Sequence, residues 1–135
     1  MQAAIWAMDR EAEDGASIEK CWFFSEESEW LADYVKENPT RYIRLLTKLT
    51  QSQYPIIRWQ AYSCLEFAGA TGIQILEKGI NDLDAYVRRR AVLALAKVSS
   101  GSVLARIDEL CRDTDIDNQR ILSRLKSELL KAARR

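Results

Sequence analysis

Two nine-residue segments of this chain align without a gap at an offset of 30 residues. One segment begins at Ile57 and the other at Val87. Both read as a β-branched residue, an arginine, two variable positions, an alanine, two variable positions, a small residue and a leucine. Self-similarity at a period of roughly 20–50 residues is typical of repeat architectures, so this period constrains the fold more than any other feature of the sequence.

The offset extends in both directions in a weaker form. Adding 30 residues places Ile121 and Leu125 at the alanine and leucine positions, although the arginine is missing there. Subtracting 30 residues places Leu31 and Val35 at the same two positions. Apolar residues that precede the aligned segments follow the same offset: Ile43, Ile73 and Val103.

The apolar spacing within one unit is helical. Val87, Ala91, Leu95 and Val98 fall at positions i, i+4, i+8 and i+11, which form one stripe along a helix of about 3.6 residues per turn. A shorter stripe precedes the longer one in each unit. We therefore predict an all-α chain in which each unit is a shorter helix followed by a longer helix.

Helix-start and helix-stop residues divide the chain further. Pro39 and Pro55 suit the first turn of a helix, and Gly69 and Gly101 suit helix ends. N-caps are expected at Asn38, Thr71, Asp82, Ser102 and either Asp115 or Asp117. The predicted helices cover about 26–37, 39–51, 55–68, 72–81, 83–99, 102–113 and 117–133, with a further short helix over about 2–13.

The middle unit resembles a known repeat family. It combines an apolar first helix, an aspartate in the turn, and a second helix that opens with Val-Arg and continues through spaced alanine and leucine. The residues that carry this pattern are Ile73, Leu76, Ile80, Asp82, Val87, Arg88, Ala91, Ala94 and Leu95. The pattern is similar to the HEAT repeat, in particular to the short bacterial type related to the HEAT-like repeats of phycobilisome lyases.

This resemblance implies a right-handed α-α superhelix, a HEAT-like solenoid of about 7–8 helices. It implies three repeats over 39–135 (40–69, 71–100 and 101–133), preceded by an N-terminal helical part, 1–38, which is either a degenerate repeat or an addition. Asp82 and Arg88 stand where the family forms a structural ladder between neighbouring units. The first unit has Ser52 at the aspartate position and the third unit lacks both residues, as end units often do.

Composition and charge limit the class of protein. The chain is 47% hydrophobic and 30% charged, which is a globular composition. It has no apolar run of about 18 residues and no secretory signal pattern at its start, so we expect a cytoplasmic protein without a membrane span. Residues 1–40 carry 3 basic and 10 acidic residues, a net charge of −7, whereas residues 41–135 carry 17 basic and 10 acidic residues, a net charge of +7. This polarity favours association with a partner, unless the two halves attract each other within one molecule.

The residues that catalysis usually needs are scarce. The chain has no histidine and no glycine-rich phosphate loop, and its 3 cysteines lack a zinc-ligand spacing. Its aspartate pairs, such as Asp82 with Asp84, stand at expected helix starts, where carboxylates cap backbone amides. We therefore expect no enzyme activity, no cofactor and no metal site.

The candidate binding residues lie on the second helices. Arg58, Arg89, Arg90, Arg120 and Arg124 could form a basic stripe that docks an acidic protein surface or phosphates, or they could be solvated arginines on ordinary helix faces. The aromatic candidates are Trp59 and Tyr62. An exposed tryptophan beside arginine is typical of interface hot spots, but Trp59 could instead pack on a neighbouring unit.

Three functions follow from these observations and from the resemblance. The first is a non-catalytic protein-binding adaptor or inhibitor that uses the face of the second helices, because small stand-alone bacterial members of this kind resemble inhibitors such as toxin-immunity proteins. The second is a nucleic-acid-binding protein, similar to HEAT-like DNA-repair glycosylases. The third is a subunit of a lyase-type enzyme, by analogy with bilin lyases.

Overall fold

The computed structural model describes residues 35–134, and these residues form helices and short connections with no strand among them. This confirms the predicted all-α fold class for the described part of the chain. Its helices are α4 (Pro39–Leu49), α5 (Pro55–Leu65), the 3-10 helix η1 (Glu66–Gly72), α6 (Ile73–Gly79), α7 (Ala85–Val98), α8 (Ser100–Leu104), α9 (Ile107–Leu110) and α10 (Ile116–Ala133). The predicted helix over 2–13 and most of that over 26–37 lie outside the described residues.

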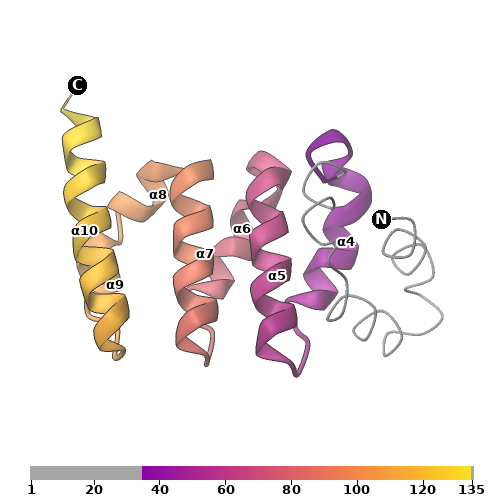
Figure 1. Cartoon of the computed structure of the whole chain (residues 1–135). Coiled ribbons are helices and arrows are strands. Elements are labelled where there is room, and N and C mark those ends of the chain that lie inside the picture. The colour runs from indigo at the N-terminus through magenta and orange to yellow at the C-terminus, as the bar shows by residue number, and fades with distance from the viewer. Residues whose placement is uncertain (1–34, 135) are drawn as a thin grey trace.

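The long helices stand side by side in chain order. Figure 1 shows α5, α7 and α10 in a row, all with their N-terminal ends at the lower edge, with α4 beside α5 at the N-terminal end of the described chain. The short helix α6 lies behind the row and contacts both α5 and α7. The second helices of the three predicted units therefore share one side of the molecule.

The N-termini of these second helices are stabilised in two different ways. A proline occupies the first turn of α5, where its missing N–H breaks no helical hydrogen bond. Asp84 caps α7 and Asp115 caps α10, and each carboxylate accepts a hydrogen bond from a backbone N–H of the first turn. The expected cap at Asp82 was wrong by two residues, because its carboxylate accepts from the backbone N–H of Asp84, which lies before the helix.

The first helices are shorter and more broken than predicted. Gly69 adopts φ 62° and ψ −145°, a conformation that favours glycine, and it interrupts the helical path inside η1. The helix predicted over 102–113 is split into α8 and α9. Thr71 and Ser102 cap no helix, since the first lies inside η1 and the second lies inside α8.

The buried positions recur with the repeat, but not at a constant offset. Ala61 and Ala91 are both 0% exposed, and the residue that takes their place in α10 is Leu122, at 1%. The sequence pattern predicted Ile121 at this place. The offset is therefore 30 residues between the first two units and 31 between the last two, so Val103 corresponds to Gly72 and not to Ile73.

The outer surface of α10 is mostly polar. Leu122 is buried and Leu125 and Leu129 pack partly against the core, while most other residues of α10 are exposed. In residues 35–134, no helix is both long and apolar enough to cross a membrane.

Candidate docking surface on the second helices

The first recurring contact between units is an ion pair that runs from α5 to the turn before α7. Arg58 donates from Nε to Oδ2 of Asp82 at 2.9 Å and from Nη2 to Oδ1 at 3.1 Å. Its Nη1 donates to the backbone oxygen of Ser52 at 2.9 Å. This hydrogen bonding raises the pKa of the Arg58 guanidinium. The planar guanidinium thus ties its own turn to the next one.

The same geometry recurs one unit later. Arg88 donates from Nε to Oδ2 of Asp113 at 2.9 Å and from Nη2 to Oδ1 at 3.0 Å. Arg88 meets Asp82 only at its backbone oxygen, at 3.0 Å. The two predicted ladder residues, Asp82 and Arg88, therefore do not pair with each other. Both residues take part in the ladder, but Asp82 pairs with the arginine of the preceding unit and Arg88 with the aspartate of the following unit.

The third unit keeps a remnant of this arrangement. Gln119 donates from Nε2 to the backbone oxygen of Asp113 at 2.7 Å, as Arg88 does to that of Asp82. The third unit therefore has its turn aspartate, Asp113, which the constant offset of 30 had missed. Gln119 replaces the arginine, and no described unit follows that would offer a carboxylate to it.

Two predicted binding residues are committed to the interior. The Arg58 side chain is 14% exposed and serves the ladder. Tyr62 is 4% exposed and lies so close to Gly79 that a Cβ there would come within 2.7 Å of its ring. Burial raises the pKa of the Tyr62 hydroxyl. Neither side chain offers a surface for docking.

Arg90 joins α7 to α5. Its Nε donates to Oγ of Ser63 at 2.8 Å, and its Nη2 lies 3.6 Å from the carboxylate of Glu66. The guanidinium also lies over the ring of Trp59, 5.9 Å from the ring centre. The side chain is 19% exposed, so its charge is largely used inside the stack.

Arg89 joins α7 to α10. Its Nε donates to Oδ1 of the buried Asn118 at 2.6 Å, and its Nη2 lies 3.6 Å from the carboxylate of Asp115. Its guanidinium lies 5.0 Å from the centre of the Tyr86 ring. The arginine run 88–90 is therefore three separate connections to neighbouring helices.

Arg120 and Arg124 are the two predicted binding residues that remain free. Both are exposed on α10 and, within the described part of the chain, neither makes a hydrogen bond or an ion pair. They are one helical turn apart and so share a side of the helix. Of the seven predicted binding residues, these two and Trp59 offer the most accessible surface.

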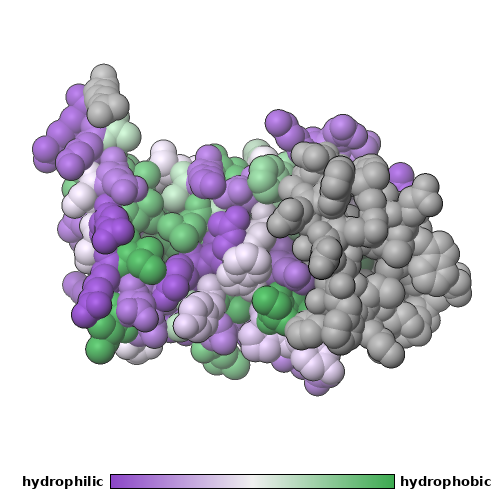
Figure 2. Space-filling model, in the orientation of Figure 1, coloured by the Kyte–Doolittle hydropathy of each residue, from purple (hydrophilic) through white to green (hydrophobic). Residues whose placement is uncertain are grey.

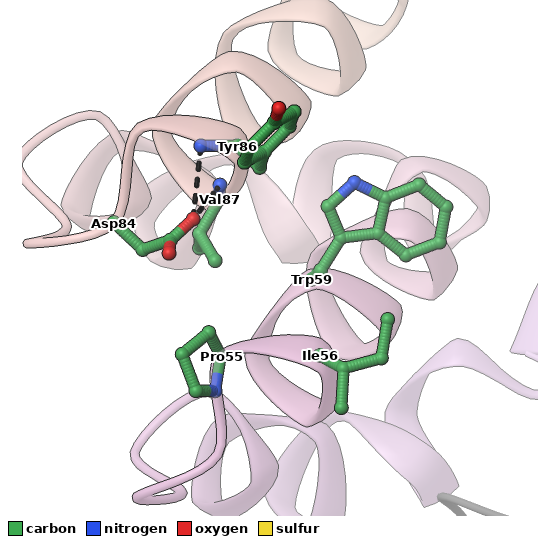
Figure 3. A pocket seen from close by; sticks show the side chains of 6 residues that line it. All are labelled: Pro55, Ile56, Trp59, Asp84, Tyr86 and Val87. Atoms are coloured by element: carbon green, nitrogen blue, oxygen red, sulfur yellow. Dashed lines mark hydrogen bonds between the residues drawn. The ribbon is translucent and has the colours of Figure 1, made fainter.

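An apolar groove lies beside Trp59. It has a volume of about 300 Å³ and runs between the N-terminal parts of α5 and α7. Figure 3 shows the six side chains that surround it: Pro55, Ile56, Trp59, Asp84, Tyr86 and Val87. The exposed fractions of Ile56, Trp59 and Tyr86 are 42%, 37% and 66%, so large apolar surfaces face solvent.

Local structure explains why the groove forms. Ile56 and Tyr86 are equivalent in the repeat, each being the residue before a buried β-branched residue of the stripe, Ile57 or Val87. Such a position faces away from the core at the start of a helix. Asp84 caps the N-terminal end of α7, because its Oδ1 accepts hydrogen bonds from the backbone N–H groups of Tyr86 at 2.9 Å and Val87 at 3.1 Å.

Sequence reasoning missed Ile56 and Tyr86, although a signal was present. Both are bulky residues at a repeat position that the helical periodicity assigns to the surface. Exposed apolar side chains continue along this edge, at or next to the starts of the three second helices: Tyr54, Ile56, Leu83, Tyr86 and Ile116. Figure 2 shows hydrophobic patches among hydrophilic ones over the lower ends of α5 and α7, whereas hydrophilic residues dominate the α10 side.

The cysteine Cys64 is buried, and its thiol does not face solvent. Burial raises the pKa of the Cys64 thiol to about 12, which leaves the thiol protonated and unreactive at neutral pH. In residues 35–134, no three His, Cys, Asp or Glu side chains gather in a way that could hold a metal ion. The accessible chemistry of the second-helix face is an apolar groove at α5 and α7 and two free guanidinium groups at α10.

Comparison with known proteins finds no match for this chain among family models, curated proteins or solved structures.

Proposed function

We propose that this chain is a non-catalytic adaptor or inhibitor that binds another protein on the face of its second helices. The observation that carries the proposal is the groove in which Ile56, Trp59 and Tyr86 expose apolar surface side by side. Tryptophan and tyrosine dominate the binding energy of protein interfaces when a partner removes them from water. Contiguous exposed apolar side chains of this kind mark an interaction site.

The repeat stack suits such a role. The recurring pairs of Arg58 with Asp82 and of Arg88 with Asp113 support our proposal that these helix pairs are HEAT-like units. Helices locked together in this way present a preformed surface, so little conformational entropy is lost when a partner binds. A toxin-immunity inhibitor is one kind of protein that would use such a surface.

The charges favour a protein partner over nucleic acid. All four arginines on the second helices of the first two units are held by carboxylates, hydroxyls or amides of neighbouring elements, and so cannot each neutralise a phosphate: Arg58, Arg88, Arg89 and Arg90. Carboxylates also line the lower edge, where Asp84 borders the groove. Phosphate binding needs several free cations without such neighbours.

The test is co-purification of the tagged full chain from cells that express it naturally. We expect one stoichiometric partner, and we expect Trp59→Ala to weaken that complex by about 2 kcal/mol, which is the size of an interface hot spot. Phe67→Ala is the matched control, because Phe67 is 41% exposed but lies outside the groove. Equal retention of the partner by both variants would exclude this face as the docking surface.

A further inference from the structure

One row of equivalent positions crosses the three second helices. Arg58, Arg88 and Gln119 are equivalent, because each donates to the backbone oxygen of the residue six positions earlier. The residues that follow them are therefore equivalent as well: Trp59 on α5, Arg89 on α7 and Arg120 on α10. These three side chains lie in one line across the face.

The chemistry changes along this row. At one end Trp59 forms a wall of the apolar groove. In the middle Arg89 is held by Asn118, and its guanidinium lies over Tyr86. At the other end Arg120 is exposed without a partner in the described residues, with the equally free Arg124 one turn further along α10. The row thus has an apolar anchor point at Trp59 and a cationic anchor point at Arg120. Between them lies Arg89, whose guanidinium is already bonded within the protein.

We infer that the partner presents a segment with two matching features: a bulky apolar side chain that enters the groove between Trp59 and Tyr86, and acidic residues that pair with Arg120 and Arg124. This inference rests on the proposed function and specifies the chemistry of the partner. Charge complementarity supports it, because bidentate arginine–carboxylate pairs need free guanidinium groups, and this face offers them at α10.

The row also sets the spacing between the two features. Packed helix axes are about 8–10 Å apart, and α7 and α10 stand further apart than α5 and α7 do (Figure 1), so the anchor points lie on the order of 20 Å or more from each other. An extended segment rises about 3.3 Å per residue and spans this distance in about six residues. We therefore expect the acidic residues about six positions from the apolar anchor in an extended partner segment.

A protein segment fits this face better than a phosphate backbone does. Asp84 lies at the groove, and Asp117 precedes Arg120 by three residues on the same side of α10. A nucleic acid places a charge at every nucleotide and would meet both carboxylates. A peptide can instead place its few acidic residues beside Arg120 and Arg124 and an uncharged residue elsewhere.

The experiment uses the isotope-labelled full chain and synthetic ten-residue peptides. The probe carries a tryptophan at position 2 and glutamates at positions 7, 8 and 9, with glycine and serine between them. Matched peptides replace the tryptophan with alanine or the glutamates with lysines. Binding is followed by NMR, through the indole N–H of Trp59, identified with Trp59→Phe, and through the Nε–H of Arg120, identified with Arg120→Lys.

We expect the probe to shift both signals, and each peptide replacement to weaken binding by about tenfold or more. The double variant Arg120→Gln/Arg124→Gln should bind the probe peptide more weakly by about the same factor. Arg44→Gln removes an exposed arginine of α4, the first helix of the first unit, and should leave the affinity for the probe unchanged. Higher salt should weaken binding of the probe peptide but not binding of the lysine peptide.

Three outcomes overturn the inference. If all peptides bind with equal affinity, the face does not distinguish acidic from basic segments. If a twelve-nucleotide single strand shifts the Arg120 signal more strongly than the probe does, the occupant is a nucleic acid. If no peptide binds and the fluorescence that is lost in Trp59→Phe is not quenched by acrylamide in the wild type, which has four tryptophans, then residues 1–34 or a second copy already cover the face. Should the natural partner still be lost with Trp59→Ala, the proposed function stands and only the acidic chemistry of the partner is wrong.

Discussion

Arg88 donates two parallel hydrogen bonds to the carboxylate of Asp113, from Nε to Oδ2 at 2.9 Å and from Nη2 to Oδ1 at 3.0 Å. The two residues are 25 positions apart in the chain. The pair joins α7 to the turn that precedes α10. The remaining nitrogen of Arg88 donates to the backbone oxygens of Asp82 and Leu83, so one side chain holds two consecutive turns. The order of the stack therefore depends on a few arginines as well as on its apolar core.

Replacing Arg88 should destabilise the chain. Arg88→Ala leaves the Asp113 carboxylate, which is 10% exposed, without its partner. We expect a loss of about 2 kcal/mol, between the value of an exposed ion pair and that of a fully buried one. Arg88→Lys should recover only part of this, because an ammonium group cannot bond both oxygens in parallel. Urea unfolding measures the loss, and exposed Arg124→Ala is the control; equal stability of the two alanine variants would contradict the prediction.

The same pair should make stability depend on pH. Its hydrogen bond to Arg88 holds the pKa of Asp113 below the ordinary value of 3.8. Because the folded-state pKa is lowered, this stabilisation is complete above the unfolded-state pKa and is lost as pH falls through the folded-state pKa. We expect the free energy of unfolding of the wild type to fall more steeply below about pH 4 than that of Asp113→Asn. Parallel curves for the two proteins in urea titrations between pH 2 and 6 would refute this role.

Gly79 is required by close packing. A Cβ at this position would lie 2.6 Å from Cβ of Ala91 and 2.7 Å from Cε1 of Tyr62. Gly79→Ala should therefore destabilise the chain by about 2 kcal/mol through overpacking, although alanine favours helix formation. At Gly101 a Cβ meets nothing within 4 Å, so Gly101→Ala should leave stability unchanged or raise it by up to about 1 kcal/mol. Thermal unfolding compares the two variants, and a stabilising Gly79→Ala would show that α6 and α7 are packed loosely.

Asn118 is a polar residue at a position that is apolar in the other units. It is 0% exposed, as Ile57 is, and its amide accepts from Arg89 and donates to the backbone oxygen of Ala85 at 2.9 Å. Asn118→Val restores the apolar repeat pattern but leaves Arg89 without this acceptor. We expect a loss of about 1–2 kcal/mol in urea unfolding, whereas exposed Ser123→Ala changes little. A variant more stable than the wild type would mean that burial of the valine outweighs the polar contact.

Local periodicity accounts for how much of the fold was predictable. The stripes that contain Ala61 and Ala91 predicted helices at α5 and α7, and both alanines are fully buried. Pro39 and Pro55 marked helix starts correctly, whereas Gly69 and Gly101, which were expected at helix ends, lie inside η1 and α8. The break between α8 and α9 and the shift from an offset of 30 to one of 31 were missed, because one extra residue in a connection changes no local pattern but moves every later residue by one position.

The candidate site was predictable only in part, because exposure depends on which neighbours reach a side chain. Arg58, Arg89 and Arg90 look alike in the sequence, and only the carboxylates, amides and hydroxyls of adjacent helices decide that their charges are used internally. Tyr62 and Trp59 are likewise similar in kind, yet one lies against Gly79 and the other borders the groove.

The sequence alone determined that this chain is helical and repetitive, since helix formation depends on residues a few positions apart and the repeat preserves those spacings. The tertiary structure decided which side chains remain available to a partner. Hydrogen bonds such as those from Arg88 to Asp113 and from Arg89 to Asn118 join residues 25 and 29 positions apart, and the neighbours they select exist only after the helices have packed.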